Sequence, residues 1–451
     1  MKKLQLLGVK NLYNVNGGKM KISVIGAGYV GAVTAVCLAE KGNQVCCYDI
    51  DKEKIDLLNK GIPAIYEQDL ENLMVKNKEK LNYTTDKNKI YEDVEAIFIC
   101  VGTPQKEDGS ANLEFVNNVI EEIVENIKND CLIVVKSTVP IGTTYRIAQY
   151  IKEKINPQYK IEVAFNPEFL SQGTAIKDTL QAQRIIIGTD SEWAKKILGK
   201  IYEDFEESII LYTDFNTAEM TKYASNNFLA LKISYINEIA NLCEILDANI
   251  DDVSKGMGLD SRIGPEFLKA GIGYGGSCFP KDTNALYKLA RENNYELRTV
   301  KSAIEVNEKQ RIKLIEKLKK YYESEKGLTI AVLGLTFKEK TNDLRQAPSI
   351  ENIKLLPAAN IKVWDPVIKE VPKEFNNITI YNTIDETIEN SDICFIFTEW
   401  DEIKKYDIKN YEKLMRKPII LDGRNCYKQD DFKETNIIYE SIGRKNIKKE
   451  V

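Results

Sequence analysis

The sequence predicts an α/β protein in which two doubly wound parallel-sheet domains are joined by a central helical domain with a long helix. Three observations support this fold class. Residues 20–213 alternate short apolar runs with helix-length segments, residues 214–318 read as helical, and the alternation resumes over residues 325–451. Apolar strands separated by helices are typical of parallel sheets buried on both faces. A chain of 451 residues is also too long for one core.

Composition narrows the classes of function. Hydrophobic residues make up 43% and charged residues 29%, which is ordinary for a soluble globular protein. The net charge of −5 argues against a nucleic-acid partner and against an anionic membrane. Apolar runs such as Ile97–Val101 are strand-sized, far short of a membrane span. Most of the nine cysteines lie in apolar runs without a Cys-x-x-Cys pair, so we expect reduced thiols and a cytoplasmic location.

Residues 1–19 are expected to form a loose N-terminal extension. Met1-Lys2-Lys3 and the leucines after it resemble the start of a signal peptide, but Lys10 interrupts the apolar stretch and no convincing cleavage site follows. Met20 opens the first strand of the first domain.

The first domain contains a series of short apolar runs that predict strands. One helix is predicted over Ala32–Lys41, closed by Gly42. The predicted strands are Lys21–Ile25, Gln44–Asp49, Ala96–Val101, Leu132–Lys136, Ile161–Phe165 and Arg184–Gly188.

The central segment carries an apolar stripe at helical spacing. Its members are three or four residues apart, which predicts one long helix over about residues 216–246. A stripe of this length often packs on a second subunit. The stripe consists of Phe228, Leu231, Tyr235, Ile239, Leu242 and Leu246.

The C-terminal segment predicts a second, smaller sheet. It has only Gly334 where a glycine fingerprint would stand, so its ligand is not expected to be a second dinucleotide. The predicted strands are Leu328–Leu333, Ile361–Trp364, Ile393–Thr398 and Ile419–Leu421.

The run Gly26-Ala27-Gly28-Tyr29-Val30-Gly31 fits the G-x-G-x-x-G fingerprint of a Rossmann-like dinucleotide-binding domain. It follows a strand, opens a helix and is answered by Asp49 at the end of the next strand, 18 residues after Gly31. The glycines let the backbone approach a pyrophosphate at a helix N-terminus. An acid at position 49 accepts hydrogen bonds from a ribose diol and repels a 2′-phosphate, which favours NAD over NADP.

Three other strands end in turns rich in proline and hydroxyl groups: Gly102–Pro104, Ser137–Pro140 and Asn166–Leu170. Each turn alone has an ordinary structural explanation. Because the carboxyl ends of parallel strands meet at one edge of a sheet, the three together predict a site for cofactor and substrate there.

Cys278 lies in the glycine-rich run 275–282, next to Lys281 and Asp282. Such a setting predicts a thiol of lowered pKa that acts as a nucleophile. Asp282 could hold a water, cap a helix that begins at Thr283, or do both. The chain has no histidine, so Cys, Lys, Asp and Glu must carry any acid–base chemistry, and no metal site is expected.

Lys222 and Asn226 are four residues apart and therefore share one face of the long helix. Composition alone favours a solvated lysine beside an asparagine. A nucleophilic thiol, however, needs a cation that stabilises a developing oxyanion, which Lys222 would supply.

Taken together, the motifs resemble the UDP-glucose 6-dehydrogenase family, within the larger UDP-glucose/GDP-mannose dehydrogenase group. The resemblance runs in order from Met20 to about Asn425, and the run around Cys278 is the most specific part. The motifs are Gly26–Gly31, Asn166–Leu170, Gly275–Asp282, Phe337-Lys338 with Asp343 and Arg345, Thr398–Trp400, and Asp422–Asn425.

The resemblance implies a four-electron oxidation of a primary alcohol to a carboxylate with two NAD, in polysaccharide biosynthesis. Cys278 would capture the aldehyde as a thiohemiacetal and hold the later thioester. Lys222 would stabilise oxyanions with help from Asn226. The remaining implied catalytic residues are Asp282 and Thr138, which would hold the water, and Glu168, which would take part in later proton transfers.

The resemblance also implies the binding residues. For the cofactor these are Gly26, Gly28, Tyr29, Val30, Gly31, Asp49, Lys54, Thr103, Thr138, Lys281 and Arg345. For the UDP-sugar substrate they are Glu168, Phe169, Leu170, Lys222, Asn226, Arg262, Tyr274, Gly275, Phe337, Lys338 and Arg424. Arg262 would reach the sugar of a neighbouring subunit, which implies a homodimer.

One departure from the family pattern concerns Ser171-Gln172, where many members have a basic residue followed by glutamate. An amide cannot act as a base, so Glu168 must suffice or the sugar differs. A GDP-mannose or UDP-N-acetylhexosamine 6-dehydrogenase is therefore an alternative. A non-catalytic NAD-binding thiol redox sensor, and a two-electron 3-hydroxyacid dehydrogenase indifferent to Cys278, are others.

Overall fold

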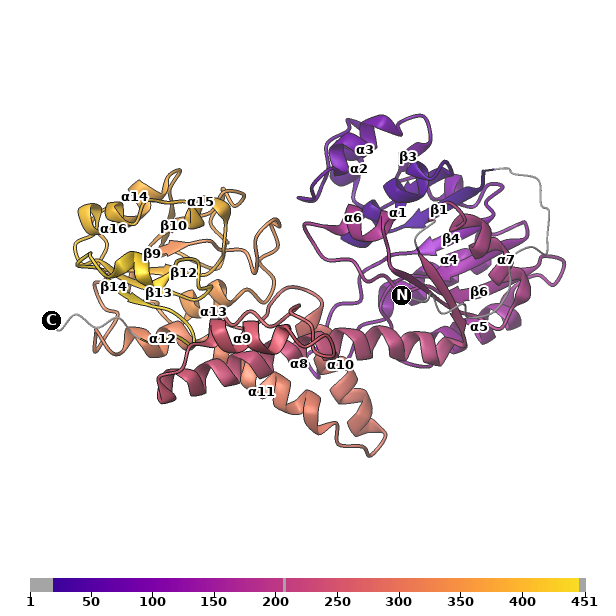
Figure 1. The fold of residues 1–451 in the computed structure, drawn as a ribbon. Coiled ribbons are helices and arrows are strands. Elements are labelled where there is room, and N and C mark those ends of the chain that lie inside the picture. The colour runs from indigo at the N-terminus through magenta and orange to yellow at the C-terminus, as the bar shows by residue number, and fades with distance from the viewer. Residues whose placement is uncertain (1–18, 206–207, 446–451) are drawn as a thin grey trace.

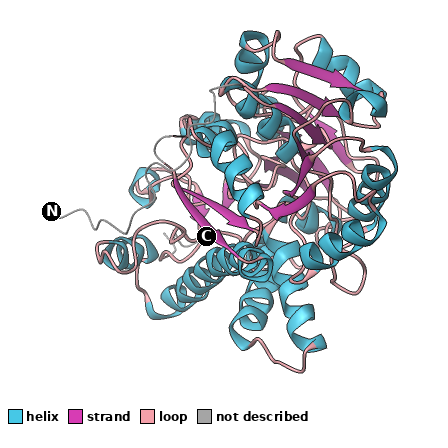
Figure 2. Ribbon diagram, turned by 90° about the vertical axis from the view of Figure 1, so that its right-hand side faces the viewer, coloured by secondary structure: helices cyan, strands magenta, loops and turns pink. Residues whose placement is uncertain are grey.

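The computed structural model describes residues 19–205 and 208–445, and it has a sheet domain at each end with helices between them (Figure 1). The expected extension over residues 1–19 lies outside the described residues except for Lys19. Figure 2, turned by 90°, shows helices packed on both sides of the strands. Among the residues that the structure describes, no helix is long and apolar enough to cross a membrane.

The N-terminal sheet has eight strands in the order β3-β2-β1-β4-β5-β6-β7-β8. All neighbouring pairs are parallel except β6 and β7, which pair antiparallel through Phe165 and Gly188. The six predicted strands are confirmed, but β3 and β8 were not predicted. The strands are β1 (Lys21–Ile25), β2 (Gln44–Tyr48), β3 (Leu81–Thr84), β4 (Ala96–Ile99), β5 (Cys131–Val135), β6 (Ile161–Phe165), β7 (Arg184–Gly188) and β8 (Ile209–Thr213).

Helices connect these strands and cover the sheet. The predicted helix over Ala32–Lys41 begins three residues earlier, because extended Gly28 caps it directly after the glycine turn. The helices are α1 (Tyr29–Glu40), α2 (Lys52–Asn59), α3 (Leu70–Lys76), α4 (Glu114–Asn126), α5 (Thr143–Lys154), α6 (Ala175–Leu180) and α7 (Glu192–Ile201).

The central region is built on α8 (Phe215–Leu246), which confirms the predicted long helix. The Asp214 side chain accepts a hydrogen bond from the backbone N–H of Thr217 and caps its start, and Asp247 ends it in the left-handed conformation. Further helices are α9 (Ile250–Gly258), α10 (Phe279–Glu292), α11 (Arg298–Arg311) and α12 (Lys313–Leu318).

The apolar stripe of α8 does not form the core of this chain. Phe228 is 62% exposed and Leu246 is 66% exposed, and Tyr235 and Leu242 are exposed as well. The helix instead buries small and polar residues against α10 and α11, among them Ala230, Ser234, Asn237 and Ala240. An exposed apolar face on one helix is typical of an interaction surface.

The C-terminal sheet has six parallel strands in the order β11-β10-β9-β12-β13-β14. The four predicted strands are confirmed, and the three-residue strands β11 and β14 were not predicted. The strands are β9 (Thr329–Leu333), β10 (Asn360–Trp364), β11 (Ile378–Ile380), β12 (Ile393–Ile396), β13 (Ile419–Asp422) and β14 (Ile438–Glu440). The helices are α13 (Pro348–Lys354), α14 (Ile384–Ile388), α15 (Asp401–Lys404) and α16 (Lys409–Leu414).

The two sheets share one strand order. Numbered along each sheet, the first six strands of the N-terminal sheet and all six of the C-terminal sheet follow the order 3-2-1-4-5-6. This order is that of a doubly wound dinucleotide-binding fold, so the predicted fold class is confirmed. Ligands of such sheets bind at the carboxyl ends of the strands, where the order reverses beside the first strand.

Candidate functional site

The glycine turn after β1 has the backbone geometry that a dinucleotide needs. Gly26 has a φ of +98°, and a Cβ on Gly31 would lie 1.7 Å from the carbonyl oxygen of Gly26. A Cβ on Gly28 would meet no atom within 4 Å, and Gly28 offers no side-chain cap to α1. The first turn of α1 therefore packs tightly on the strand side and stays open on the ligand side.

Asp49 lies directly against this turn. One carboxylate oxygen accepts hydrogen bonds from the backbone N–H of Ala27, at 2.8 Å, and from Lys54 Nζ, at 3.0 Å. The structure thus brings Asp49 and Lys54 to the glycine turn, as predicted. The placement fits a ribose diol bound beside the turn.

Tyr29 points away from that ligand side and into a buried cluster. Its hydroxyl hydrogen-bonds to the carboxylate of Glu67 and accepts a hydrogen bond from the backbone N–H of Gly173, at 2.9 Å. Burial and the neighbouring Glu67 raise the pKa of Tyr29 well above its ordinary value. Glu67 was not predicted from the sequence, because it is 38 residues from Tyr29.

The turns after β4 and β5 are tied to each other. Thr103 Oγ1 donates to the backbone carbonyl of Thr138 at 2.9 Å, and Ser137 Oγ donates to that of Val101 at 2.7 Å. Because β4, β5 and β6 are neighbours in the sheet, the three predicted turns lie along one edge. Thr138 and Thr103 are therefore held at that edge.

The turn after β6 carries a buried carboxylate that pairs with the long helix. Lys222 Nζ lies 3.0 Å from Glu168 Oε1, and both side chains are buried. Burial opposes the charge of Lys222, but Glu168, Asp282 and Cys278 outweigh it and raise the pKa of the lysine. Lys222 is therefore held in its charged ammonium form near the thiol.

The two residues after Glu168, Phe169 and Leu170, fix the conformation of this turn. Glu168 Oε2 accepts a hydrogen bond from the backbone N–H of Leu170, at 2.7 Å. The ring of Phe169 lies between two cations, with the guanidinium of Arg184 4.3 Å and Lys222 Nζ 5.2 Å from its centre. Such contacts restrict the ring and the turn that carries it.

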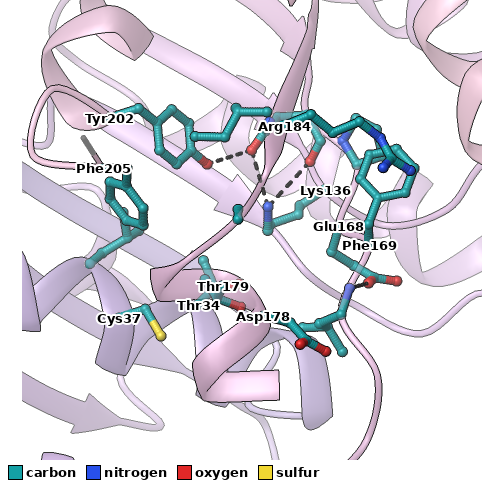
Figure 3. A pocket seen from close by; sticks show the side chains of 16 residues that line it. Thr34, Cys37, Lys136, Glu168, Phe169, Asp178, Thr179, Arg184, Tyr202 and Phe205 are labelled. Atoms are coloured by element: carbon teal, nitrogen blue, oxygen red, sulfur yellow. Dashed lines mark hydrogen bonds between the residues drawn. The ribbon is translucent and has the colours of Figure 1, made fainter. Parts of the chain in front are cut away.

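A buried lysine that the sequence did not single out supports the same turn from below (Figure 3). Lys136 Nζ donates to the side-chain oxygen of Asn166 at 3.1 Å and to its backbone carbonyl at 3.4 Å. The Tyr202 hydroxyl donates to the same side-chain oxygen at 2.5 Å. These residues line a cavity that also reaches Glu168 and Phe169. Burial lowers the pKa of Lys136. A lysine ending an otherwise apolar strand was the available signal.

Asp282 accepts hydrogen bonds from two of the predicted site residues. Lys281 Nζ lies 2.6 Å from one carboxylate oxygen and Asn226 Nδ2 lies 2.6 Å from the other. The predicted helix start at Thr283 is wrong, since α10 begins at Phe279 and Asp282 lies within its first turn. Asp282 therefore does not cap this helix, and its carboxylate is directed into the site.

Cys278 stands at the N-terminal cap of α10 with an exposed side chain. The prediction of a lowered pKa is wrong: desolvation by the surrounding protein, then Glu168 and Asp282, raise the pKa of the thiol. Lys222 and Lys281 offset only part of this effect. The sequence placed Lys281 and Asp282 beside the thiol but could not show the desolvation or the approach of Glu168.

The C-terminal domain closes on the glycines before Cys278. A Cβ on Gly275 would lie 2.3 Å from the backbone oxygen of Gln346, and one on Gly276 would lie 2.8 Å from the Phe337 ring. Tyr274 is buried, and its backbone N–H donates to Asn307 Oδ1 at 2.8 Å. The loop with Phe337 therefore forms one wall of the turn that carries the thiol.

The basic residues that were predicted to bind ligands, Arg345, Lys338 and Arg424, each hydrogen-bond to other groups of the protein. Arg345 pairs with Asp343, Nη2 to Oδ2 at 2.7 Å, and Lys338 Nζ donates to Ser171 Oγ at 2.8 Å. Arg424 donates to three backbone carbonyls, those of Phe397, Gly273 and Phe337, and so joins the C-terminal sheet to the central region.

Arg262 is exposed and pairs with Asp260 in the same turn. Its guanidinium hydrogen-bonds to the carboxylate of Asp260 through both Nε and Nη2, rather than to the groups around Cys278. A role for Arg262 at a neighbouring subunit's site stays a prediction.

Comparisons with known proteins agree along the chain. Residues 20–206 match the model of the UDP-glucose/GDP-mannose dehydrogenase family, NAD binding domain. Residues 216–309 match the central domain of that family and residues 331–429 its UDP binding domain.

Curated relatives and solved structures cover nearly the whole chain. The UDP-glucose 6-dehydrogenase YwqF of Bacillus subtilis is 46% identical over 95% of this chain and 98% of its own length. TuaD, a UDP-glucose 6-dehydrogenase of the same species, is 42% identical over 94% and 93%. The structure of a UDP-glucose dehydrogenase from Pyrobaculum islandicum has a TM-score of 0.86 at 33% identity, covering 93% of this chain and 98% of that one. A UDP-D-ManNAc dehydrogenase from Pyrococcus horikoshii has a TM-score of 0.83 at 27% identity, covering 94% and 99%.

Proposed function

The chain belongs to the UDP-glucose/GDP-mannose dehydrogenase family, and from this premise we propose that it oxidises UDP-glucose to UDP-glucuronate with NAD. The observation that carries the proposal is the convergence of Cys278, Lys222, Glu168 and Asp282 beside one another. The curated relatives named UDP-glucose 6-dehydrogenase support the choice of sugar.

The residues present fit the dinucleotide. The open face at Gly28, the close packing of Gly31 and the carboxylate of Asp49 are what a pyrophosphate and a ribose diol require. Bound NAD supplies the hydride acceptor for each of the two oxidations. The protein's own groups carry the protons and hold the carbon that reacts.

The sulfur of Cys278 forms the covalent bond to substrate. After the first oxidation the thiol adds to the aldehyde carbon: the S–C bond forms, the carbonyl π electrons move onto the oxygen, and the proton that the thiol gives up is balanced by one that this oxygen takes up, which leaves the hydroxyl of a thiohemiacetal. The second oxidation removes a hydride from that carbon and a proton from its hydroxyl, leaving a thioester. Water then attacks the thioester carbon, the C–S bond breaks, and the carboxylate and the free thiol result.

The charged side chains divide the remaining work. Lys222, held as a buried ammonium by Glu168, stabilises the oxyanions that develop on the substrate oxygen. Asp282, held by Lys281 and Asn226, positions the hydrolytic water with Thr138. Glu168 takes the proton from that water, which removes the need for an imidazole.

The assembly we propose is a homodimer in the cytoplasm. The exposed apolar face of α8 supports the dimer, because a face of this size on one helix needs a partner. A partner on α8 would also bring Arg262 of one subunit toward its neighbour. The free cysteines support a reducing compartment.

The decisive measurement is the ratio of NADH formed to UDP-glucose consumed by the purified enzyme. We expect two NADH per sugar and UDP-glucuronate as product. A ratio of one, or turnover only with GDP-mannose or a UDP-N-acetylhexosamine in a parallel panel, would overturn the proposal. Binding of NAD without turnover of any of these sugars would instead favour the redox-sensor alternative.

A further inference from the structure

One side chain of the N-terminal domain both donates and accepts a hydrogen bond across to the C-terminal domain. Gln172, in the turn after β6, donates from Nε2 to Asp343 Oδ2 at 3.0 Å. Its Oε1 accepts a hydrogen bond from Thr341 Oγ1 at 2.7 Å. Both partners lie in the loop after β9, 171 and 169 residues away along the chain.

Two neighbours of Gln172 meet the same loop. Ser171 Oγ accepts a hydrogen bond from Lys338 Nζ at 2.8 Å. Gly173 has a φ of +86°, and a Cβ at that position would lie 2.7 Å from the Cβ of Lys340. On its other side, the backbone N–H of Gly173 donates to Glu67 Oε2 at 2.7 Å, so the turn is anchored in its own domain. We call residues 171–173 and 338–343 the interdomain clasp.

The clasp continues to the thiol through backbone and side-chain contacts. The guanidinium of Arg345 binds both carboxylate oxygens of Asp343, at 2.8 and 2.7 Å. The backbone carbonyl of Arg345 accepts a hydrogen bond from the N–H of Gly276 at 2.9 Å, two residues before Cys278. An unbroken path therefore runs from Gln172 through Asp343 to the turn that carries the sulfur.

We propose that Gln172 is a positioning residue, whose neutral amide holds the two sheet domains together so that Cys278 stands opposite Glu168. The inference rests on the proposed function only in assigning Cys278 as the nucleophile. An amide can donate to Asp343 and accept from Thr341 at once, whereas a carboxylate can only accept. The amide of Gln172 thus makes one donated and one accepted hydrogen bond to the C-terminal domain, which an ionised carboxylate could not do.

The charges around Gln172 determine what a carboxylate there would meet. Four carboxylates lie in or close to the clasp: Asp343 and Glu339 on the loop, Asp178 bonded to the N–H of Ser171, and Glu67 below Gly173. The cations are Lys338, Lys340 and Arg345, and each already has a partner in the clasp. An introduced carboxylate would lose the donor to Asp343 and face its negative charge at hydrogen-bond distance.

The test compares Gln172→Glu and Gln172→Ala with Gln181→Glu, the same chemical change on an exposed residue at the end of α6. We expect Gln172→Glu to lower kcat at least tenfold and to increase the rate of Cys278 alkylation by iodoacetamide at least threefold. Amide hydrogen exchange in residues 337–346 should accelerate. The Kd of NADH should stay within twofold, because the glycine turn is not part of the clasp. Gln172→Ala should show a smaller effect in the same direction.

A pH series separates charge from simple loss of packing. The ratio of wild-type to Gln172→Glu activity should shrink as pH falls toward 5 and the introduced carboxyl takes up a proton, while the Gln172→Ala ratio stays constant. Alkylation and exchange rates of Gln172→Glu that equal those of Gln181→Glu would overturn the proposal. Such rates would mean that the new carboxylate, for example by pairing with a lysine, holds the two domains together as well as the amide does. Both rates are measured without sugar, so a wild-type enzyme inactive on UDP-glucose would refute the proposed function and still leave the clasp tested.

Discussion

At the scale of single residues, the proposed chemistry depends on a thiol whose surroundings oppose its ionisation. Desolvation first, then Glu168 and Asp282, raise the pKa of Cys278, and Lys222 and Lys281 offset only part of this effect. The unreacted protein at neutral pH therefore holds mostly thiol. The reactivity of this thiol increases as the solution becomes alkaline.

The first prediction follows from the sign of this shift. Because the folded protein favours the protonated sulfur, the thiolate fraction should rise with pH through and beyond about 8.5, the ordinary cysteine value. The alkylation rate of Cys278 should increase continuously from pH 7 to pH 9, with a midpoint above that of free cysteine. A rate already constant at pH 7 would contradict the raised pKa. Cys278→Ser, alkylated as a control, should remove the fast-reacting site and stop net acid formation.

The second prediction concerns Lys136. Replacing it by methionine keeps the volume but removes both hydrogen bonds to Asn166, and should loosen the turn that carries Glu168. We expect kcat to fall roughly 10- to 100-fold, or about 1–3 kcal/mol in the barrier. Tyr202→Phe, which removes one bond to the same oxygen, should cost less. An unchanged kcat in folded Lys136→Met would show that the turn does not need this support.

Predictability at this scale was uneven. Cys278, Lys222 and Asp282 could be found because each stands in a short run with its own chemical signature. Glu67 and Lys136 could not, because their importance comes from partners 38 and 30 residues away. Sequence distance also hid the approach of Glu168 to the sulfur, and the sequence could not show the burial that contributes most to the sign of its pKa shift.

At the scale of elements, two glycines of the turn after β1 have different roles: Gly31 is needed for packing, and Gly28 leaves room for a ligand. Gly31→Ala would place a Cβ 1.7 Å from the Gly26 carbonyl, whereas Gly28→Ala meets no atom within 4 Å. We expect Gly31→Ala to destabilise the fold by on the order of 1–3 kcal/mol or more. Gly28→Ala should leave the thermal unfolding temperature nearly unchanged and weaken NADH binding at least tenfold. Equal stability of both variants, measured by calorimetry, would contradict the close packing of α1 on the glycine turn.

Elements were easiest to predict where their apolar pattern was strong. The central strands β1, β4, β5 and β9 are buried along almost their whole length, and the sequence located each within two residues at either end. The strands β3, β11 and β14 have three or four residues each, and unlike the equally short β4 they are only partly buried, so their apolar pattern is weak. β8, an exposed edge strand, depends on pairing with β7 for its place.

At the scale of the whole molecule, α8 carries both candidate site residues and an exposed apolar face. One part of the helix presents buried Lys222 and Asn226 to the site, and its apolar stripe faces outward. A stripe that looks like a core in the sequence is thus an outer surface of the single chain. Periodicity identifies an apolar face but not whether the chain itself or a second copy covers it.

The fourth prediction tests that face. Phe228→Glu combined with Leu242→Glu places two charges on exposed positions, so the monomer should fold normally while association weakens. Analytical ultracentrifugation should show a shift from dimer to monomer. Ile245→Glu, which changes another exposed apolar residue of α8, tests how far the interface extends. Wild-type protein that sediments as a monomer would refute the homodimer.

The packing of Gly275 and Gly276 against Phe337 and Gln346 has a consequence for biosynthesis. The ribosome releases the segment with Cys278 well before the loop that encloses it, since that loop belongs to the last sheet to be made. A partly synthesised chain can bring the sulfur beside Lys222 and Asp282 before Phe337 and Gln346 exist to pack on the glycines next to it. Maturation therefore ends when the loop after β9 packs on the turn that carries Cys278, and a product truncated before that loop would lack this wall of the turn.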